Sequence, residues 1–236
     1  MLNQIMKQIK SLIPKSWKRT IKKVAGKLSE PKRYKYCVEL IHSNRCKKIM
    51  EIGTYNGENA MRMIKAAGRF HRPDTIEYYG FDLFELMDEK TLKKEVSKKP
   101  PTVDNVKTKL QNTGAQINLF KGFTHQTLPR FISTMPVMDF ILIDGGHSIN
   151  TISNDWKYAK KLMDQNTLVV FDDYWSGDYG KHKNAGCQHL IDRLDRNEFN
   201  VTILPEQDIF QTKSGTLKIN YVLVKKALAK NHEIAF

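Results

Sequence analysis

The chain has 236 residues, of which 40% are hydrophobic and 27% are charged. This composition is typical of a folded globular protein and excludes a disordered chain, and the length suits one α/β domain. No run of residues comes near the roughly 18–20 consecutive apolar residues that a membrane-spanning helix needs. The basic N-terminus lacks the features of a secretory signal, and the three cysteines are scattered without CxxC spacing. We therefore expect a cytoplasmic protein with reduced thiols.

The net charge of +14 is concentrated at the N-terminus, where residues 1–35 hold eleven Lys and Arg and one acid. Apolar residues recur there in steps of three and four, which predicts amphipathic helices interrupted near Pro14. We therefore expect a basic helical arm over residues 1–35, followed by one domain over residues 36–236. A helix with such an apolar face usually packs on its own domain or on a second subunit of a homo-oligomer. The alternative is that residues 1–28 lie on an anionic membrane surface, which would make the protein peripheral at the inner membrane.

From Lys47 onward, short apolar runs alternate with helical stretches, as in parallel βαβ units. Residues 86–114 are polar, rich in lysine and interrupted by two prolines, which predicts a helix followed by an exposed loop. Seven strands are predicted, over residues 48–52, 77–82, 117–121, 138–143, 167–171, 199–204 and 219–224.

The first predicted strand ends in Glu51-Ile-Gly53-Thr-Tyr55-Asn-Gly57. Two glycines at a strand-to-helix turn let the backbone approach a ligand, and the next helix offers free N–H groups. The motif lacks the third glycine of GxGxxG. The wider loop suits the uncharged sugar and amino-acid tail of S-adenosylmethionine better than a pyrophosphate. Glu51, Gly53, Tyr55 and Gly57 are therefore candidate cofactor-binding residues; the alternative is a tight structural turn.

Further cofactor contacts are expected at the tips of the next two strands. Asp82 ends the second predicted strand, where an acid can accept hydrogen bonds from ribose hydroxyls. The alternative is that Asp82 caps the next helix. Phe123 and Thr124 lie just past the third strand and are candidates for the adenine site.

Three carboxylates are expected at the tips of the fourth and fifth strands. The fourth strand runs into Asp-Gly-Gly-His at 144–147, and the fifth runs into Asp172-Asp173. Neighbouring tips of a parallel sheet meet at its carboxyl edge, so the three carboxylates would converge and repel one another. A divalent cation bound by Asp144, Asp172 and Asp173, either Mg²⁺ or Mn²⁺, would relieve this repulsion. The alternative is that Asp172 caps a helix while Asp173 is solvated.

The motifs Glu-Ile-Gly-x-x-x-Gly, Gly-Phe-Asp, Ile-Asp-Gly-Gly-His and Val-Phe-Asp-Asp-Tyr, in this order, resemble class I methyltransferases of the macrocin O-methyltransferase type. The resemblance covers about residues 47–225. It implies an α/β, Rossmann-like fold with a seven-stranded mixed sheet in the order 3-2-1-4-5-7-6 and helices on both faces. It also implies that the three aspartates hold Mg²⁺ facing an acceptor sugar. Some members carry an acid, proposed as the base, where this chain has Gly146; others carry a histidine that matches His147.

We therefore predict an O-methyltransferase that uses S-adenosylmethionine and a divalent cation to modify a hydroxyl of a sugar or similar polyol. His147 is expected to be the general base, because an imidazole titrates near neutral pH. The alternative is a histidine that only packs or donates a hydrogen bond. Acceptor contacts are expected from residues 83–114 and 176–184.

Two other classes of function stay open. The first is an RNA or protein methyltransferase, or a nucleic-acid-binding protein, that uses the basic arm. The domain has no Asn-Pro-Pro-Tyr-like motif and no aromatic-rich basic stripe, so nucleic acid is disfavoured as a partner. The second is a non-methylating, hydroxylase-like relative on the same scaffold, since a fold does not fix a function.

Overall fold

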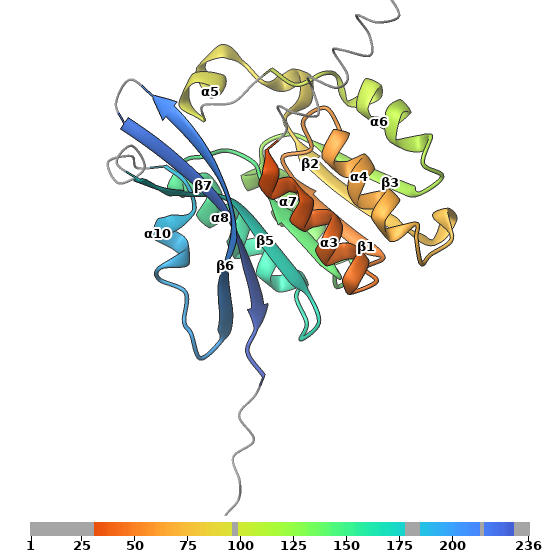
Figure 1. Cartoon of the computed structure of the whole chain (residues 1–236). Coiled ribbons are helices and arrows are strands. Elements are labelled where there is room, and N and C mark those ends of the chain that lie inside the picture. Colours follow the sequence, from red (N-terminus) through yellow and green to blue (C-terminus); the bar gives the residue numbers. More distant parts are fainter. Residues whose placement is uncertain (1–30, 96–98, 178–184, 213–214, 229–236) are drawn as a thin grey trace, which may run out of the picture.

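The computed structural model of the chain describes residues 31–95, 99–177, 185–212 and 215–228. Its seven strands form one sheet in the order β3-β2-β1-β4-β5-β7-β6, which confirms the predicted Rossmann-like topology (Figure 1). The first five strands are parallel, and β7 runs antiparallel between β5 and β6. The strands are β1 (Lys48–Ile52), β2 (Glu77–Asp82), β3 (Gln116–Lys121), β4 (Phe140–Ile143), β5 (Leu168–Ser176), β6 (Phe199–Thr212) and β7 (Gly215–Lys226).

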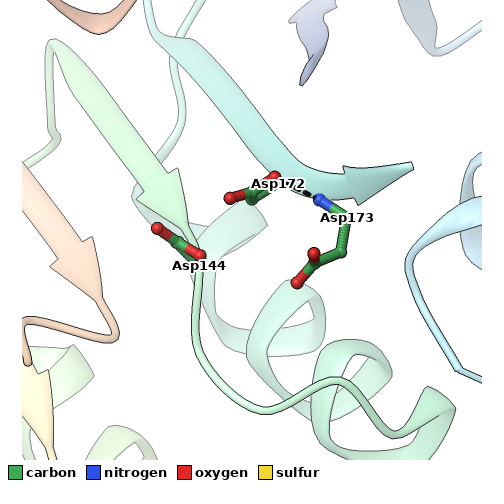
Figure 2. Close-up of side chains that lie close together, drawn as sticks. All are labelled: Asp144, Asp172 and Asp173. Carbon is green, nitrogen blue, oxygen red and sulfur yellow. Dashed lines mark hydrogen bonds between the residues drawn. The ribbon is translucent and has the colours of Figure 1, made fainter. Parts of the chain in front are cut away.

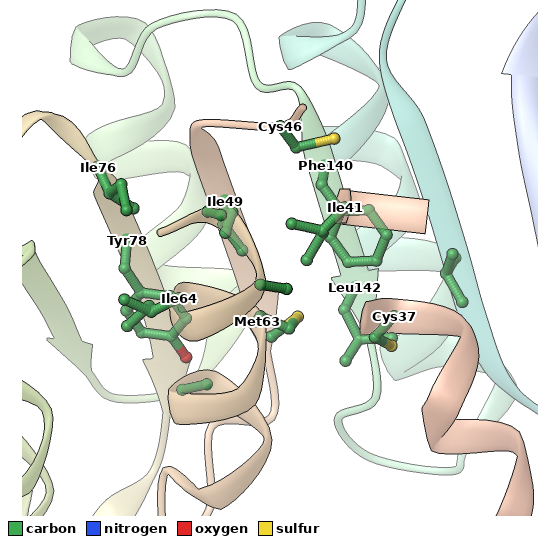
Figure 3. Close-up of a cluster of buried hydrophobic side chains, with 14 of the residues drawn as sticks. Cys37, Ile41, Cys46, Ile49, Met63, Ile64, Ile76, Tyr78, Phe140 and Leu142 are labelled. Atoms are coloured by element: carbon green, nitrogen blue, oxygen red, sulfur yellow. The ribbon is translucent and has the colours of Figure 1, made fainter. Parts of the chain in front are cut away.

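Helices cover both faces of the sheet and divide the apolar core into two layers. Because successive strand residues point to opposite faces, Ile49 belongs to one layer and Met50 to the other. The first layer lies under α3 (Lys35–Ser43), α4 (Glu58–Ala67) and α6 (Val103–Gln111), and part of it is drawn in Figure 3. The second layer lies under α7 (Thr124–Phe131), α8 (Ile149–Ala159) and α10 (Gln188–Ile191).

Strand β5 carries a bulge at the point where its two aspartates lie. Its register with β7 shifts between Phe171 and Tyr174. Asp173 has a φ of 61°, a left-handed conformation that is uncommon outside glycine. Consecutive strand residues normally point to opposite faces, but a bulge redirects one of them. The bulge therefore allows Asp172 and Asp173 to direct their carboxylates toward the same site.

The last two strands are longer than predicted. The sequence predicts strands over residues 199–204 and 219–224, whereas β6 and β7 form a long hairpin. Pro205 interrupts the apolar alternation and lies where the register of the pair shifts, between Ile203 and Gln207. A proline cannot donate to the ladder and is tolerated at such an irregularity on an edge strand.

Residues 86–114, predicted as one helix and an exposed loop, contain two helices in their described part. Helix α5 (Glu89–Lys94) follows the 3₁₀ turn η3 (Phe84–Leu86), and α6 begins after the two prolines. Glu95, at the end of α5, is only 7% exposed. Part of the segment therefore packs against the domain.

Most of the predicted arm lies outside the described residues, so its helices and its contact with a membrane or partner stay predictions. Residues 31–35, which we assigned to the arm, belong structurally to the domain. They form the 3₁₀ turn η1 (Lys32–Tyr34) and the start of α3, and Arg33 is 5% exposed. In the part of the chain that is described, no helix is both long and apolar enough to cross a bilayer.

Candidate active site

A cavity of about 1140 Å³ opens at the carboxyl edge of the sheet, where the tips of β1, β2, β4 and β5 meet. Ligands bind at this edge in open α/β sheets. Of the predicted site residues, only Gly57 is absent from the cavity wall. A Cβ on Gly57 would lie 3.1 Å from Val106 and 3.3 Å from Leu110 of α6, and its φ is 70°, so both packing and backbone conformation favour glycine there. The predicted residues on the wall are Glu51, Gly53, Tyr55, Asp82, Phe123, Thr124, Asp144, His147, Asp172 and Asp173.

Gly53 allows two strand tips to approach each other closely. A Cβ at this position would lie 1.9 Å from the carbonyl oxygen of Asp144, and the residue has a φ of 98°. Both facts require glycine, since any other side chain would clash and would disfavour this backbone conformation. We predicted that Gly53 brings the backbone close to a ligand; the structure gives it the further role of joining the glycine loop to the Asp144 loop.

Glu51 is a buried carboxyl group on β1 at the base of the glycine loop. It accepts hydrogen bonds from the hydroxyl of Tyr78 and from Nδ2 of Asn59, the latter at 3.3 Å. Burial raises the pKa of Glu51 to about 8, although these two hydrogen bonds act in the opposite direction. Oδ1 of Asn59 is buried without a hydrogen-bond partner among the described residues, and Asn59 lines the cavity. This oxygen is available to a donor group of a bound ligand.

Asp82 joins two loops at the cavity. One carboxylate oxygen accepts the backbone N–H of Tyr55 at 2.7 Å, and the other accepts that of Phe84 at 2.9 Å. Burial raises the pKa of Asp82, while these hydrogen bonds lower it. A carboxylate oxygen can accept more than one hydrogen bond, so both oxygens retain capacity for a ligand.

The three predicted aspartates come together, as Figure 2 shows. One carboxylate oxygen from each of Asp144, Asp172 and Asp173 lies within 4.8 Å of the others. Burial, followed by the charges of the other two carboxylates, raises the pKa of Asp144 well above its usual value. Clustered oxygen donors whose charges oppose one another are suited to a hard divalent cation. The donor set therefore fits Mg²⁺ or Mn²⁺.

Arg33 partly neutralises this cluster, which the sequence did not reveal. Its Nε and Nη2 donate to the two carboxylate oxygens of Asp172 at 2.7 and 2.8 Å, and its Nη1 donates to Asp208 at 2.8 Å. A bidentate arginine–carboxylate pair is strong and geometrically specific. The repulsion expected among the carboxylates is therefore offset in part by a residue of the chain itself. The alternative, in which Asp172 caps a helix and Asp173 is solvated, is wrong, because Asp172 pairs with Arg33 and Asp173 is only 6% exposed.

His147 pairs with the third aspartate. Its Nε2 lies 2.9 Å from Oδ2 of Asp173, while the indole N–H of Trp175 donates to Oδ1 at 2.9 Å. Burial lowers the pKa of His147, but the hydrogen bond and charge of Asp173 outweigh it and raise the pKa to about 9. Nδ1 is buried without a partner among the described residues. With Nε2 held by Asp173, Nδ1 is the nitrogen that remains available for proton transfer.

Two further buried acidic side chains on the cavity wall were missed by the sequence analysis. Asp155 of α8 is fully buried, and burial raises its pKa to about 7. Glu95 contacts the start of the same helix. Both carboxylates lie in polar segments whose sequence does not distinguish them from solvated acids. The sequence offered one signal, Gly146, because a glycine beside the site leaves room for another side chain. In the structure Glu95 occupies this room, and Gly146 has no positive φ that would itself require glycine.

Comparison with known proteins identifies the family of the chain. The sequence profile of the methyltransferase domain family matches residues 50–174, and the chain belongs to this family. No curated protein matches the chain.

Solved structures share the fold at low sequence identity. The O-methyltransferase TomG of Streptomyces achromogenes, involved in tomaymycin synthesis and solved with SAM, is 16% identical (TM-score 0.55; 81% of this chain and 79% of that chain covered). An O-methyltransferase of Bacillus cereus, solved with SAH, is 17% identical (TM-score 0.55; 95% and 97%). An rRNA methylase of Streptococcus thermophilus is 11% identical (TM-score 0.55; 84% and 98%). At such identities the likeness concerns the fold, and the acceptor has to be argued from the site.

Proposed function

We propose that the protein is an S-adenosylmethionine-dependent and divalent-cation-dependent O-methyltransferase that modifies a hydroxyl of a sugar or similar polyol. The observation that carries the proposal is the convergence of Asp144, Asp172 and Asp173 on the wall of a cavity that also contains the glycine loop. A methyltransferase domain supplies the class of reaction. The cation site supplies the class of acceptor, because such a site can bind two neighbouring oxygens of one molecule.

The cofactor would lie over the tips of β1 and β2. The loop of Gly53 would hold the methionine end, and the free Oδ1 of Asn59 would accept a hydrogen bond from its ammonium group. Asp82 would accept hydrogen bonds from the ribose, and Phe123 and Thr124 would flank the adenine. Two fold neighbours solved with SAM or SAH support this choice of cofactor.

Replacement of Asp82 by alanine is expected to weaken binding of S-adenosylhomocysteine about tenfold to a hundredfold. The variant loses charge-assisted hydrogen bonds to the ribose, which contribute roughly 1.5–3 kcal/mol. Titration calorimetry gives the affinity, and thermal unfolding checks that the loops held by Asp82 persist. Asp74→Ala is the matched control, because Asp74 is exposed and pairs with Arg72 outside the cavity. Unchanged affinity in Asp82→Ala would remove Asp82 from the cofactor site.

The chain's own residues would then prepare the acceptor for in-line attack on the methyl group. Asp144, Asp172 and Asp173 would hold a divalent cation, whose Lewis-acid chemistry would make an acceptor hydroxyl more acidic. Asp173 orients the His147 ring through Nε2, which leaves Nδ1 to take the hydroxyl proton. Fixing the acceptor oxygen close to the methyl group supplies much of the remaining acceleration.

Methyl transfer to a glycan is the direct test of this function. We expect the purified protein to convert labelled S-adenosylmethionine into S-adenosylhomocysteine only when Mg²⁺ or Mn²⁺ and a pool of glycans or glycosides are present. Mass spectrometry should find an increase of one methyl group on a carbohydrate. Label in RNA or protein instead would contradict the proposed acceptor. Absence of S-adenosylhomocysteine with every acceptor pool would contradict methyl transfer itself.

A further inference from the structure

Glu95 forms an unusual cap at the start of α8. Its Oε2 accepts the backbone N–H of Ser148 at 2.9 Å, and its Oε1 accepts the hydroxyls of Ser148 and Thr151 at 3.0 and 3.1 Å. Ser148 is itself the N-cap residue of α8. A carboxylate is favoured at a helix N-terminus, where N–H groups lack partners within the helix. Glu95 thus joins the end of α5 to a turn that lies 53 residues further along the chain.

Gly146 leaves the space that the Glu95 carboxylate occupies. A Cβ at position 146 would lie 2.5 Å from Oε2 and 2.9 Å from Cδ of Glu95, so a side chain there would require the carboxylate to move. Gly146 does not have a positive φ, so its backbone conformation does not require glycine. The glycine is explained by the space that Glu95 occupies.

His147 directly precedes Ser148, one of the two residues that Glu95 contacts. Its backbone carbonyl accepts the N–H of Gly186 at 2.8 Å, and the following N–H, that of Ser148, is held by Glu95. Both contacts hold the same peptide group, the one that joins His147 to Ser148, and they come from two distant segments. The direction of the imidazole follows from this backbone, since a χ1 rotation starts from the position of Cα and Cβ.

We propose that Glu95 is a positioning residue for His147: it holds the turn over residues 146–148 so that the imidazole meets the reacting oxygen. The inference rests on the proposed function, in which His147 is the base. Glu95 also comes from a segment whose Met87, Thr91 and Lys94 line the cavity. The segment that borders the acceptor therefore also fixes the base. A displacement of about 1 Å at a reacting group can cost about a hundredfold in rate.

The test compares Glu95→Ala with Glu95→Gln in the full chain. Alanine releases the turn and is expected to lower kcat about tenfold to a hundredfold, with little change in affinity for S-adenosylhomocysteine. Glutamine can accept the Ser148 N–H through its oxygen and donate to the two hydroxyls through its amide, so it should restore most of kcat. Glu89→Ala is the matched control, because Glu89 is an exposed acid of α5 outside the cavity wall. Equal losses in the alanine and glutamine variants would overturn the proposal.

A second pair of variants tests the contact itself. Gly146→Ala should displace the Glu95 carboxylate and lower kcat to a similar extent as Glu95→Ala. In the Glu95→Ala background the space is open, so adding Gly146→Ala should cost little more, and the two effects should not add. Fully additive losses would show that the residues act independently and would overturn the proposal.

NMR of histidine-labelled protein separates this inference from the proposed function. The ring signal of His147, assigned by its loss in His147→Ala, should shift in Glu95→Ala and return toward its native position in Glu95→Gln. This measurement needs no turnover, so it remains decisive if the protein transfers no methyl group. An unmoved His147 signal in Glu95→Ala would overturn the positioning role even if methyl transfer is found.

Discussion

Removal of divalent cations is expected to abolish methyl transfer and to leave affinity for S-adenosylhomocysteine nearly unchanged. The three carboxylates are different residues from Glu51 and Asn59 of the glycine-loop region, so the cofactor and the cation would use different ligands. Activity should vanish with EDTA and return when Mg²⁺ or Mn²⁺ is added in excess. Turnover assays and calorimetry on the same sample separate the two effects. Full turnover in metal-free buffer would contradict the cation's role and leave the three aspartates as structural groups.

Asp144→Asn is the cleanest variant for this prediction. Asp172 is paired with Arg33, and Asp173 is paired with His147. Replacing either aspartate would therefore also leave its Arg33 or His147 side chain without this partner. In the described segments, no lysine, arginine or histidine forms an ion pair with Asp144. Loss of its charge weakens the cation site, and the cation's Lewis-acid chemistry would supply several kcal/mol of transition-state stabilisation. We expect kcat to fall more than about a hundredfold.

His147→Ala is expected to lower kcat by about 10²–10⁴ while cofactor and cation binding persist. Without a cation, the neighbouring carboxylates raise the pKa of this imidazole to about 9. A divalent cation among them disfavours a second positive charge and so favours the neutral ring that a base requires. His147→Gln should not restore the rate, because an amide can form hydrogen bonds but cannot take the proton.

Steady-state kinetics with saturating cofactor and cation measure this loss. The matched control is His189→Ala, since His189 is exposed and lies outside the cavity wall. Recovery of most of the rate in His147→Gln would mean that His147 only orients the acceptor. Loss of the cation in His147→Ala would mean that the residue supports Asp173, and that the base lies elsewhere.

Local patterns in the sequence were sufficient to predict the site's framework. Strands β1 and β2 begin and end where their apolar runs do. The carboxyl ends of parallel strands meet at one edge, so Asp82, Asp144 and Asp172 could be assigned to the site from their places at the ends of the predicted strands. Asp173 was predicted on the same ground. Its carboxylate joins the cluster because β5 carries a bulge at this point, and the bulge could not be predicted from the sequence.

Partners that come from distant segments could not be predicted. Arg33 is 139 residues from Asp172, and Glu95 is 53 residues from Ser148. Neither periodicity nor turn chemistry records such pairings, because both describe neighbours along the chain. Arg33 also lies in a run of basic residues that was attributed as a whole to the arm, so a buried arginine looked like one more exposed charge.

The guanidinium of Arg33 would limit the number of cations that the strand tips can hold. Together with the carboxylates of Asp144, Asp172, Asp173 and Asp208 it carries a formal charge of −3 when His147 is neutral. One divalent ion would reduce this charge to −1, whereas a second would leave an excess of one positive charge in a buried site. Two-metal enzymes keep their ions about 3.5–4 Å apart by supplying carboxylates to both. Here both carboxylate oxygens of Asp172 are already held by an arginine that is part of the chain.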